Sequence, residues 1–345
     1  MRHVPQRTEC EIRPYREEDE GEVLDLLSVT LGSGPAGLRS PEFFRWKHWE
    51  NPFGPSYMLV AEADSRIVGL RAFMRWSFRS GDSMVRAVRA VDTATHPHYQ
   101  GQGIFSLLTR QSVEGFREHV DLVFNTPNEK SLPGYLKMGW SVVGKVPIFV
   151  RIRRLSRLLG GLRDLHSATA PPTSGPSVKA EEAVEALSDP GIPSLLAEVS
   201  EASDPRLATP RGPEYLRWKY GSAPLLDYRG VREHVSGALT GVALFRIRPR
   251  GRLWESTVAE LIVRPGDVGT ARRLLRRVVG AAFVEHLTCH FPRGSASARA
   301  ARRAGFLPVP GGMTFVVNQL HEQRMKPDPN LLRSWALSLG DLEVF

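Results

Sequence analysis

The sequence is poor in cysteine and contains no long apolar run. Its two cysteines, Cys10 and Cys289, lie far apart and outside any Cys-x-x-Cys pattern, which argues against a disulfide framework and a zinc site. No stretch of about 18 apolar residues occurs, so no membrane span is expected. The polar segment 1–14 lacks the apolar core of a secretory signal, and a cytoplasmic location is therefore expected.

Basic residues outnumber acidic ones, with 46 Lys and Arg against 37 Asp and Glu. The formal net charge of +9 suits an anionic ligand such as a nucleotide, and it would also suit nucleic acid. However, the sequence contains no zinc finger, RNP motif or basic-aromatic groove, so nucleic acid is not expected as a partner. Arginine in place of lysine is also typical of a GC-rich genome.

The length of 345 residues predicts two domains, and 41% hydrophobic content is ample for their cores. An internal repeat supports this division. SPEFFRWKHW (40–49) returns as GPEYLRWKY (212–220), VDTATHP (91–97) as AELIVRP (259–265), and YLKMGW (135–140) as ARRAGF (301–306). Because the matches keep their order and nearly constant spacing, we expect two copies of one domain.

Residues 166–176, HSATAPPTSGP, have the composition of a linker. We therefore expect a first domain at 1–160, a linker at 161–179, a second domain at 180–320, and a C-terminal helix and tail at 321–345. Apolar periodicity in the first copy predicts the order β-α-α-β-β-β-α-β-α-β. This order indicates an α/β fold, with a mixed sheet that carries helices on both faces.

Local patterns make further structural predictions. Ser40 and Pro41 predict the N-cap and first turn of a helix, and residues 141–152 are expected to form one closing strand. Asp328 and Pro329 predict the start of an amphipathic helix. The apolar residues after that helix predict that the tail docks on the fold.

The segment HPHYQGQGIFSLL (96–108) contains a glycine loop, residues 96–103, that joins a predicted strand to a predicted helix. Gly101 and Gly103 would let the backbone approach a phosphate at the positive end of that helix. A P-loop would need Gly-Lys-Ser/Thr, and a dinucleotide fingerprint would need a third glycine where this chain has Ser106. The loop fits the pattern Gln/Arg-x-x-Gly-x-small at all but its last position, Phe105, and this pattern binds a pyrophosphate through backbone N–H groups.

Four segments in order resemble the GNAT superfamily of acyl-CoA N-acyltransferases. They are EIRPYREED (11–19), VDTATHPHYQGQGIFSLL (91–108), VDLVFNTPN (120–128) and SLPGYLKMGW (131–140). The resemblance implies acetyl-CoA as co-substrate, with its pyrophosphate in the glycine loop, and an amine as acceptor. Phe105 departs from the pattern, because the family more often has glycine or alanine there. The tandem arrangement is similar to the enhanced-intracellular-survival acetyltransferases and mycothiol synthase.

The resemblance also assigns roles to individual residues. The expected cofactor-binding residues are Thr93, Ala94, Thr95, Gln100, Gly101, Gln102, Gly103, Ile104, Phe105 and Asn128. Asn128 is at least as well suited to cap the helix that follows it. Tyr135 occupies the place of the family's general acid, which protonates the leaving thiolate; packing beside Trp140 is the alternative role.

Asp92 is the only acidic residue in its predicted strand. It is a candidate to take a proton from the incoming ammonium or to anchor it, and pairing with Arg86 or Arg89 is the alternative. His96 and His98 flank a proline, but no third ligand lies nearby in the sequence, so no metal is expected.

The second copy has lost the residues to which the resemblance assigns chemistry. Val268 aligns with Gln100, Ala271 with Gly103, and Ala301 with Tyr135. Its core positions remain, and Trp46 and Trp218 are expected to be core anchors. We therefore expect a degenerate, non-catalytic domain that walls the substrate cleft.

The expected activity is acetyl transfer from acetyl-CoA to a small amine, such as an amino sugar or an antibiotic-like metabolite, by direct attack in a ternary complex. A protein or peptide N-acetyltransferase and a binding protein that senses acyl-CoA are the alternatives. The resemblance further implies that the carboxylate of Phe345 reaches the acetylation site; a tail that only packs between the copies is the alternative.

Overall fold

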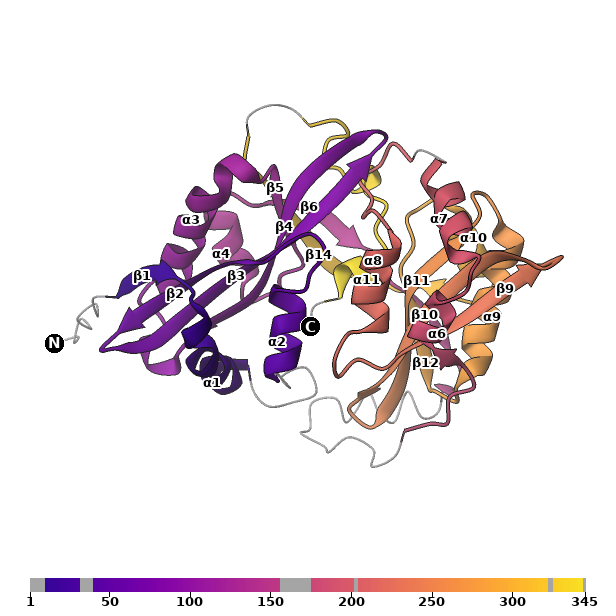
Figure 1. Cartoon of the computed structure of the whole chain (residues 1–345), viewed down its shortest axis with the longest axis horizontal. Coiled ribbons are helices and arrows are strands. Elements are labelled where there is room, and N and C mark those ends of the chain that lie inside the picture. Colours follow the sequence, from indigo (N-terminus) through magenta and orange to yellow (C-terminus); the bar gives the residue numbers. More distant parts are fainter. Residues whose placement is uncertain (1–9, 32–39, 156–174, 202–203, 322–324, 344–345) are drawn as a thin grey trace.

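The computed structural model describes residues 10–31, 40–155, 175–201, 204–321 and 325–343. Two mixed sheets of seven strands each lie side by side (Figure 1). In spatial order, the first contains β1 (Glu11–Pro14), β2 (Tyr57–Ala63), β3 (Arg66–Ser80), β4 (Ser83–Thr95), β5 (Leu122–Asn125), β14 (Met313–Gln319) and β6 (Ser141–Val146). The second contains β13 (Leu307–Pro308), β7 (Phe149–Ile152), β12 (His286–Cys289), β11 (Leu253–Val263), β10 (Ala238–Arg250), β9 (Tyr228–Val235) and β8 (Glu181–Glu182). The expected α/β fold with a mixed sheet in each copy is confirmed.

Helices cover both faces of each sheet. The first sheet carries α1 (Glu20–Leu31) and α2 (Pro41–His48) on one face, and α3 (Ile104–Phe116) and α4 (Leu132–Lys137) on the other. The second carries α6 (Ala183–Leu187), α7 (Ile192–Glu201) and α8 (Pro213–Leu216) on one face, and α9 (Val268–Ala281) and α10 (Ala296–Arg303) on the other. No helix among the described residues is long and apolar enough to cross a membrane.

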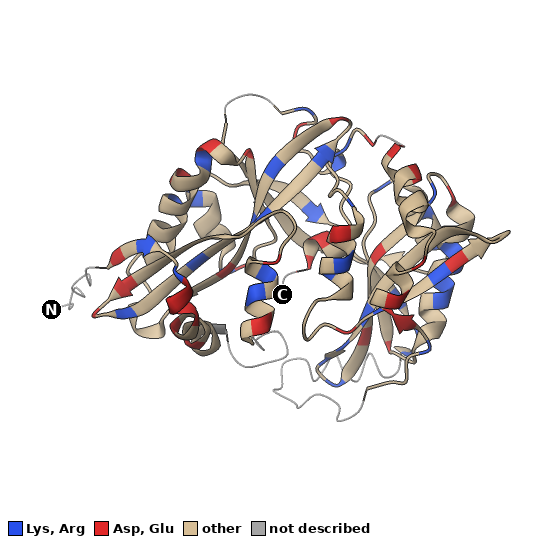
Figure 2. Cartoon of the chain, in the orientation of Figure 1, with Lys and Arg blue, Asp and Glu red and all other residues tan. Residues whose placement is uncertain are grey.

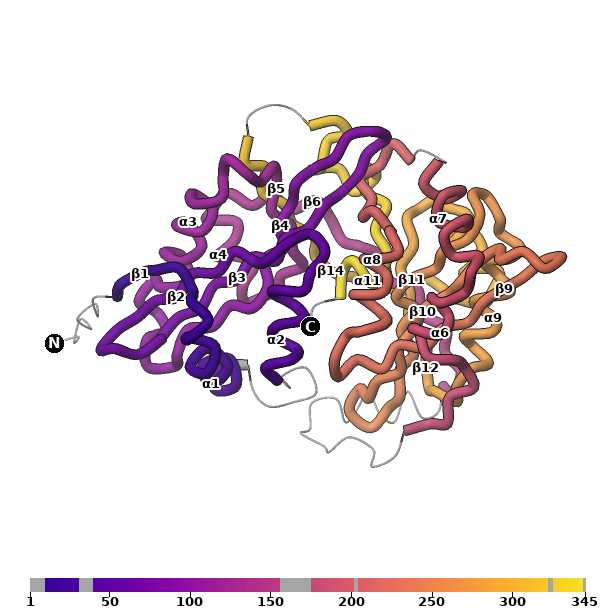
Figure 3. The backbone as a smooth tube through the Cα atoms, viewed as in Figure 1, coloured from indigo at the N-terminus to yellow at the C-terminus, as the bar shows by residue number. Residues whose placement is uncertain are grey.

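The chain crosses between the sheets, as the tube in Figure 3 shows. β6 belongs to the first sheet and β7 to the second, so the expectation of one closing strand over 141–152 is wrong. Pro147 follows β6 directly and has no N–H to continue a ladder. β14 then returns from the second half and pairs with β5 and β6. No single cut in the chain separates the two sheets, and most of the expected linker lies outside the described residues.

The repeated tryptophans meet between the two sheets, where α2 lies beside the helical turn that follows α8 (Arg217–Gly221) (Figure 1). The indole Nε1 of Trp46 donates to the carbonyl oxygen of Trp218 at 2.9 Å, and the Nε1 of Trp218 donates to the carbonyl oxygen of Trp46 at 2.9 Å. The rings stack with centroids 5.1 Å apart, and both are buried. The expectation that these residues are core anchors is confirmed, and the reciprocal bonds join the two copies.

Trp46→Phe is expected to lower the free energy of unfolding by about 2 kcal/mol, because it removes a buried hydrogen bond and part of the stacked surface. Urea denaturation at fixed protein concentration measures the change. Trp49→Phe is the matched control, since Trp49 ends the same helix but is 38% exposed. Equal effects of the two substitutions would show that the reciprocal contact does not hold the copies together.

The C-terminal segment departs from the expected helix. The carboxylate of Asp328 accepts a hydrogen bond from the backbone N–H of Asn330 at 2.9 Å and closes a turn rather than capping a long helix. The backbone N–H of Ala336 then donates to the carbonyl oxygen of Leu207 at 2.9 Å, and this bridge to the α7–α8 connection replaces helical bonds. The chain ends its described course in the one-turn helix α11 (Leu339–Leu342), whose leucines are buried. The described part of the tail therefore docks, as expected.

Candidate active site

β4 and β5 are parallel neighbours over only a short distance. β5 pairs with residues 87–89 of β4, although β4 continues to Thr95. Asp92 forms a bulge in β4, so that Arg71 of β3 pairs with Thr93. Beyond residue 89, the backbone of β4 is therefore not paired with β5, and its polar groups face the opening between the two strands.

The glycine loop leads directly into α3. Gly101 and Gly103 have φ angles of +79° and +86°, in the left-handed region. A Cβ at either position would meet no atom within 4 Å, so backbone conformation rather than crowding favours glycine here. The first turn of α3 leaves N–H groups without helical acceptors, and these groups are suited to an anion.

A pocket of about 460 Å³ lies where the end of β4 meets this loop. It is lined by Thr93, Ala94, Thr95, Tyr99, Gln100, Gly101, Gly103, Ile104 and Phe105. All of these except Tyr99 are residues that the sequence predicted to bind the cofactor. The predicted residues Gln102 and Asn128 lie outside the lining. The Asn128 side chain accepts a hydrogen bond from the backbone N–H of Ser131 at 2.9 Å, in the turn before α4, whose N-cap is Ser131.

Tyr135 of α4 lies beside this pocket. Its hydroxyl oxygen accepts a hydrogen bond from Nη2 of Arg71 at 2.9 Å. Its ring packs against Trp140, with centroids 5.2 Å apart, as the sequence allowed. The packing holds the ring, while the hydroxyl takes part in a polar contact. No motif in the sequence pointed to Arg71 as a partner of Tyr135.

The packing of Phe105 explains why this chain departs from the glycine or alanine that the family more often has at this position. Its ring meets the ring of Tyr135 edge-on, with centroids 5.6 Å apart. A Cβ on Gly134 would lie 3.1 Å from the Phe105 ring, so the glycine makes room for it. Phe105 thus fills the space between α3 and α4 and links the pocket to Tyr135.

Residues 11–143 match the sequence model of the family described as "Acetyltransferase (GNAT) domain". They form a GNAT acetyltransferase domain. None of the curated proteins compared matches the sequence. The fold of nearly the whole chain recurs in a GCN5-related N-acetyltransferase from Anabaena variabilis, at 12% identity and a TM-score of 0.61, over 91% of this chain and 73% of that one.

Two further structures share this fold. A conserved protein of unknown function from Enterococcus faecalis is 12% identical with a TM-score of 0.61, over 91% of this chain and 73% of its own. Eis1 from Mycobacterium abscessus is 14% identical with a TM-score of 0.52, over 90% of this chain and 74% of its own. At these identities the likeness shows the fold alone. It extends beyond the GNAT domain at 11–143 into the second sheet.

Asp92 of the GNAT domain is buried and faces α2. Its Oδ2 lies 2.7 Å from Nζ of Lys47 and 3.0 Å from Nε2 of His48. The alternative of pairing with Arg86 or Arg89 is therefore wrong. Lys47 belongs to the repeated segment at 40–49, which was the only signal of this partner. The catalytic role expected for Asp92 stays a prediction.

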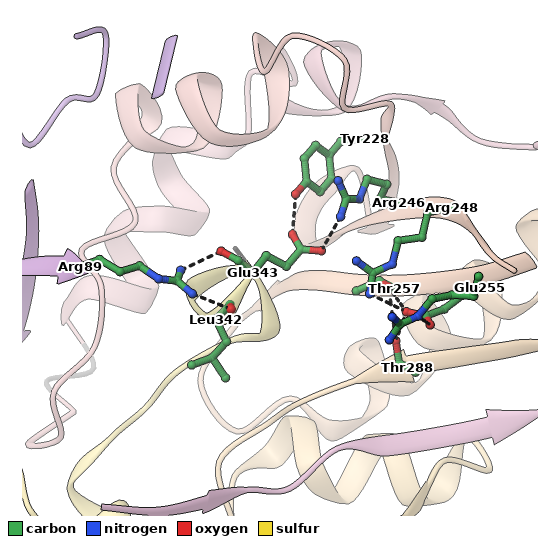
Figure 4. Close-up of polar contacts among 10 residues, drawn as sticks. Arg89, Tyr228, Arg246, Arg248, Glu255, Thr257, Thr288, Leu342 and Glu343 are labelled. Carbon is green, nitrogen blue, oxygen red and sulfur yellow. Dashed lines mark hydrogen bonds and ion pairs between the residues drawn. The ribbon is translucent and has the colours of Figure 1, made fainter. Parts of the chain in front are cut away.

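Arg89 holds the tail against the GNAT domain (Figure 4). Its guanidinium donates to the carbonyl oxygens of Asp341, Leu342 and Glu343 at 2.6 to 2.8 Å. Burial lowers the pKa of Arg89 to about 10, which leaves it charged at neutral pH. The Glu343 side chain accepts a hydrogen bond from the hydroxyl of Tyr228 at 2.5 Å, so the tail bridges both sheets. Phe345 and its expected carboxylate role lie outside the described residues.

The second copy differs from the GNAT domain at the start of the corresponding helix. The Asp267 side chain caps α9 by accepting a hydrogen bond from the backbone N–H of Thr270 at 2.8 Å. Burial raises the pKa of Asp267, but the bonds from Thr270 and the nearby Arg273 outweigh it and lower the pKa below its usual value. A carboxylate therefore occupies the place that a pyrophosphate would need.

A larger cavity of about 1000 Å³ lies mainly in the second half of the chain, and Arg79 of β3 also lines it. Its walls come from α7, the connection to α8 and the end of β11, and it does not touch the glycine loop. Size alone therefore does not identify the cofactor site. The backbone geometry at the start of α3 is what distinguishes the smaller pocket.

The described residues contain no group of three or more His, Cys, Asp or Glu placed to hold a metal ion. In Figure 2, basic and acidic residues occur close together on both halves of the molecule. Arg86 and Asp121 form one such ion pair, at 2.8 Å. The expectation that nucleic acid is not a partner stays a prediction.

Proposed function

We propose that the protein is an N-acetyltransferase that transfers an acetyl group from acetyl-CoA to the amine of a small molecule, by direct attack in a ternary complex. The observation that carries the proposal is the pocket formed by the end of β4 and the glycine loop, beside the opening between β4 and β5. The family match of residues 11–143 supports the same reaction class.

Each part of the site has a role in this proposal. The backbone N–H groups at the start of α3 bind the pyrophosphate of the co-substrate. The backbone of residues 93–95, which β5 does not pair, binds the pantetheine amides and polarises the thioester carbonyl. The amine nitrogen forms the new C–N bond and releases a proton to solvent; Asp92 is predicted to deprotonate or anchor the incoming ammonium. Tyr135 gives its proton to the sulfur as the C–S bond breaks.

A small acceptor is favoured by what covers the first sheet. α2 packs on the helical turn that follows α8 (Arg217–Gly221), and the tail held by Arg89 lies against β4 on the same side. One hydrophobic core runs through α1, α2, α6, α7 and α8. This packing covers part of that face of the first sheet. A large acceptor would therefore have less room there than a small one.

A screen of an amine library tests the proposal, with release of free thiol from acetyl-CoA as the readout. We expect release with a subset of small amines and mass-spectrometric detection of the N-acetyl products. Release only with peptides or proteins would favour a protein N-acetyltransferase. Binding of acetyl-CoA without release for any amine would indicate a protein that senses acyl-CoA.

A further inference from the structure

β3 carries a fully buried arginine that the proposed chemistry has not used. Arg71 is 0% exposed. Its Nη2 donates to the Tyr135 hydroxyl at 2.9 Å, and its Nη1 lies 3.5 Å from the carbonyl oxygen of Val91. Its Nε has no hydrogen-bond partner, and no carboxylate pairs with the guanidinium in the part of the chain that the structure describes.

Aromatic rings surround this cation. The Arg71 guanidinium carbon lies 4.3 Å from the ring centroid of Phe73, 5.5 Å from that of Phe105 and 5.4 Å from that of Tyr135. The rings offset part of the cost of removing a charge from water. Burying a cation without an anion still costs more free energy than burying an apolar residue of similar size. Core packing alone therefore does not explain an arginine at this position.

We propose that Arg71 is a positioning residue that orients Tyr135 and stabilises its anion; this proposal rests on the proposed acetyl transfer. Because Arg71 donates to the hydroxyl oxygen, the proton of Tyr135 must point away from the guanidinium. That proton is then available to another acceptor, such as the sulfur of the leaving thiolate.

Arg71 has a second effect, on the negative charge that Tyr135 carries after it gives up its proton. When the C–S bond breaks, its electron pair goes to sulfur, and the hydroxyl proton of Tyr135 follows. The phenolate that remains lies beside a cation in a water-poor environment, where the attraction between them is strong. Solvent then returns a proton to Tyr135, matching the proton that the acceptor amine releases.

Arg75 provides a matched control for Arg71. It lies four residues along β3, on the same face of the strand, with its guanidinium carbon 4.4 Å from the ring centroid of Tyr57. Its Nε likewise has no hydrogen-bond partner among the described residues. Arg75 therefore shares the aromatic setting of Arg71 but makes no hydrogen bond to Tyr135.

The test is a double-mutant cycle on kcat, in the thiol-release assay. We expect Arg71→Met to lower kcat by about 10²-fold, while the KM and Kd for acetyl-CoA change by less than about threefold. On the Tyr135→Phe background, Arg71→Met should cause no further loss, because its effect passes through the hydroxyl. Arg71→Lys should recover about tenfold over Arg71→Met, and Arg75→Met should change kcat by less than about twofold.

Losses that multiply in the double mutant would overturn the proposal, and so would a normal kcat for Arg71→Met. If Arg71→Met does not fold, judged by circular dichroism, the same cycle run with Arg71→Lys decides. A wild-type protein that binds acetyl-CoA but acetylates no amine would overturn the proposed function, and the role of Arg71 with it. An active wild type with multiplying losses would overturn the role of Arg71 alone.

Discussion

Tyr135→Phe is expected to lower kcat by about 10²- to 10⁴-fold, the range typical of general acid catalysis, with little change in the affinity for acetyl-CoA. The substitution keeps the ring, which packs edge-on against Phe105 and beside Trp140, and removes only the hydroxyl. It therefore removes the proton donor without opening a cavity in the core. Steady-state kinetics and calorimetry with acetyl-CoA measure the two effects separately.

Tyr57→Phe is the control for this substitution. Tyr57 also packs against the α3 side of the first sheet, with its ring centroid 5.1 Å from that of Phe116, and it does not line the pocket. We expect its kcat to match that of the wild type. If Tyr135→Phe retained full turnover, Tyr135 would be a packing residue, and water would protonate the thiolate.

The elements that the sequence predicted correctly are specified by local signals. Ser40 accepts a hydrogen bond from the backbone N–H of Phe43 at 3.2 Å, as expected of an N-cap, and α2 begins at Pro41. The glycine loop lies between β4 and α3, as its spacing predicted. Both features are specified by residues within a few positions of one another, so they can be recognised in a single sequence.

The polar contacts of the site were not predictable in this way. Arg71 and Tyr135 are 64 residues apart, and Lys47 and Asp92 are 45 apart. Arg71 and Arg75 alternate with apolar residues along β3, a pattern typical of a strand with one exposed face. The structure instead buries that face under α3 and α4, so the same alternation places a cation in the core.

The exchange of strands between the two sheets also could not be predicted from the sequence. β14 pairs with β5 and β6 through backbone hydrogen bonds, which carry no residue-specific signal. The prediction of a long helix in the tail was wrong for a similar reason. The Asp328–Pro329 pattern marks a helix start, but the backbone bridge between Leu207 and Trp335 competes with helical bonds and prevails.

Gly103→Asp is expected to weaken the binding of coenzyme A by about 100-fold or more, because it places a carboxylate at the helix start that receives the pyrophosphate. Space does not limit the variant, since a Cβ at Gly103 would meet no atom within 4 Å. Aspartate and asparagine tolerate the left-handed conformation better than other residues. Asp267 already provides a carboxylate cap for α9 in the second copy, so the chain accommodates this arrangement.

Two controls accompany this variant. The first separates the effect of the side chain's charge from the effect of its shape, and the second tests which copy binds coenzyme A. Gly103→Asn has nearly the same shape as Gly103→Asp but no charge, and it should weaken binding by about tenfold or less. Gly266→Asp places the same side chain one residue before the N-cap of α9 in the second copy, at a glycine with φ of +78° and no atom within 4 Å of its Cβ. Calorimetry should show wild-type affinity for Gly266→Asp. If Gly103→Asp bound normally and Gly266→Asp did not, the cofactor site would belong to the second copy, and the proposed roles of the glycine loop and Tyr135 would be wrong.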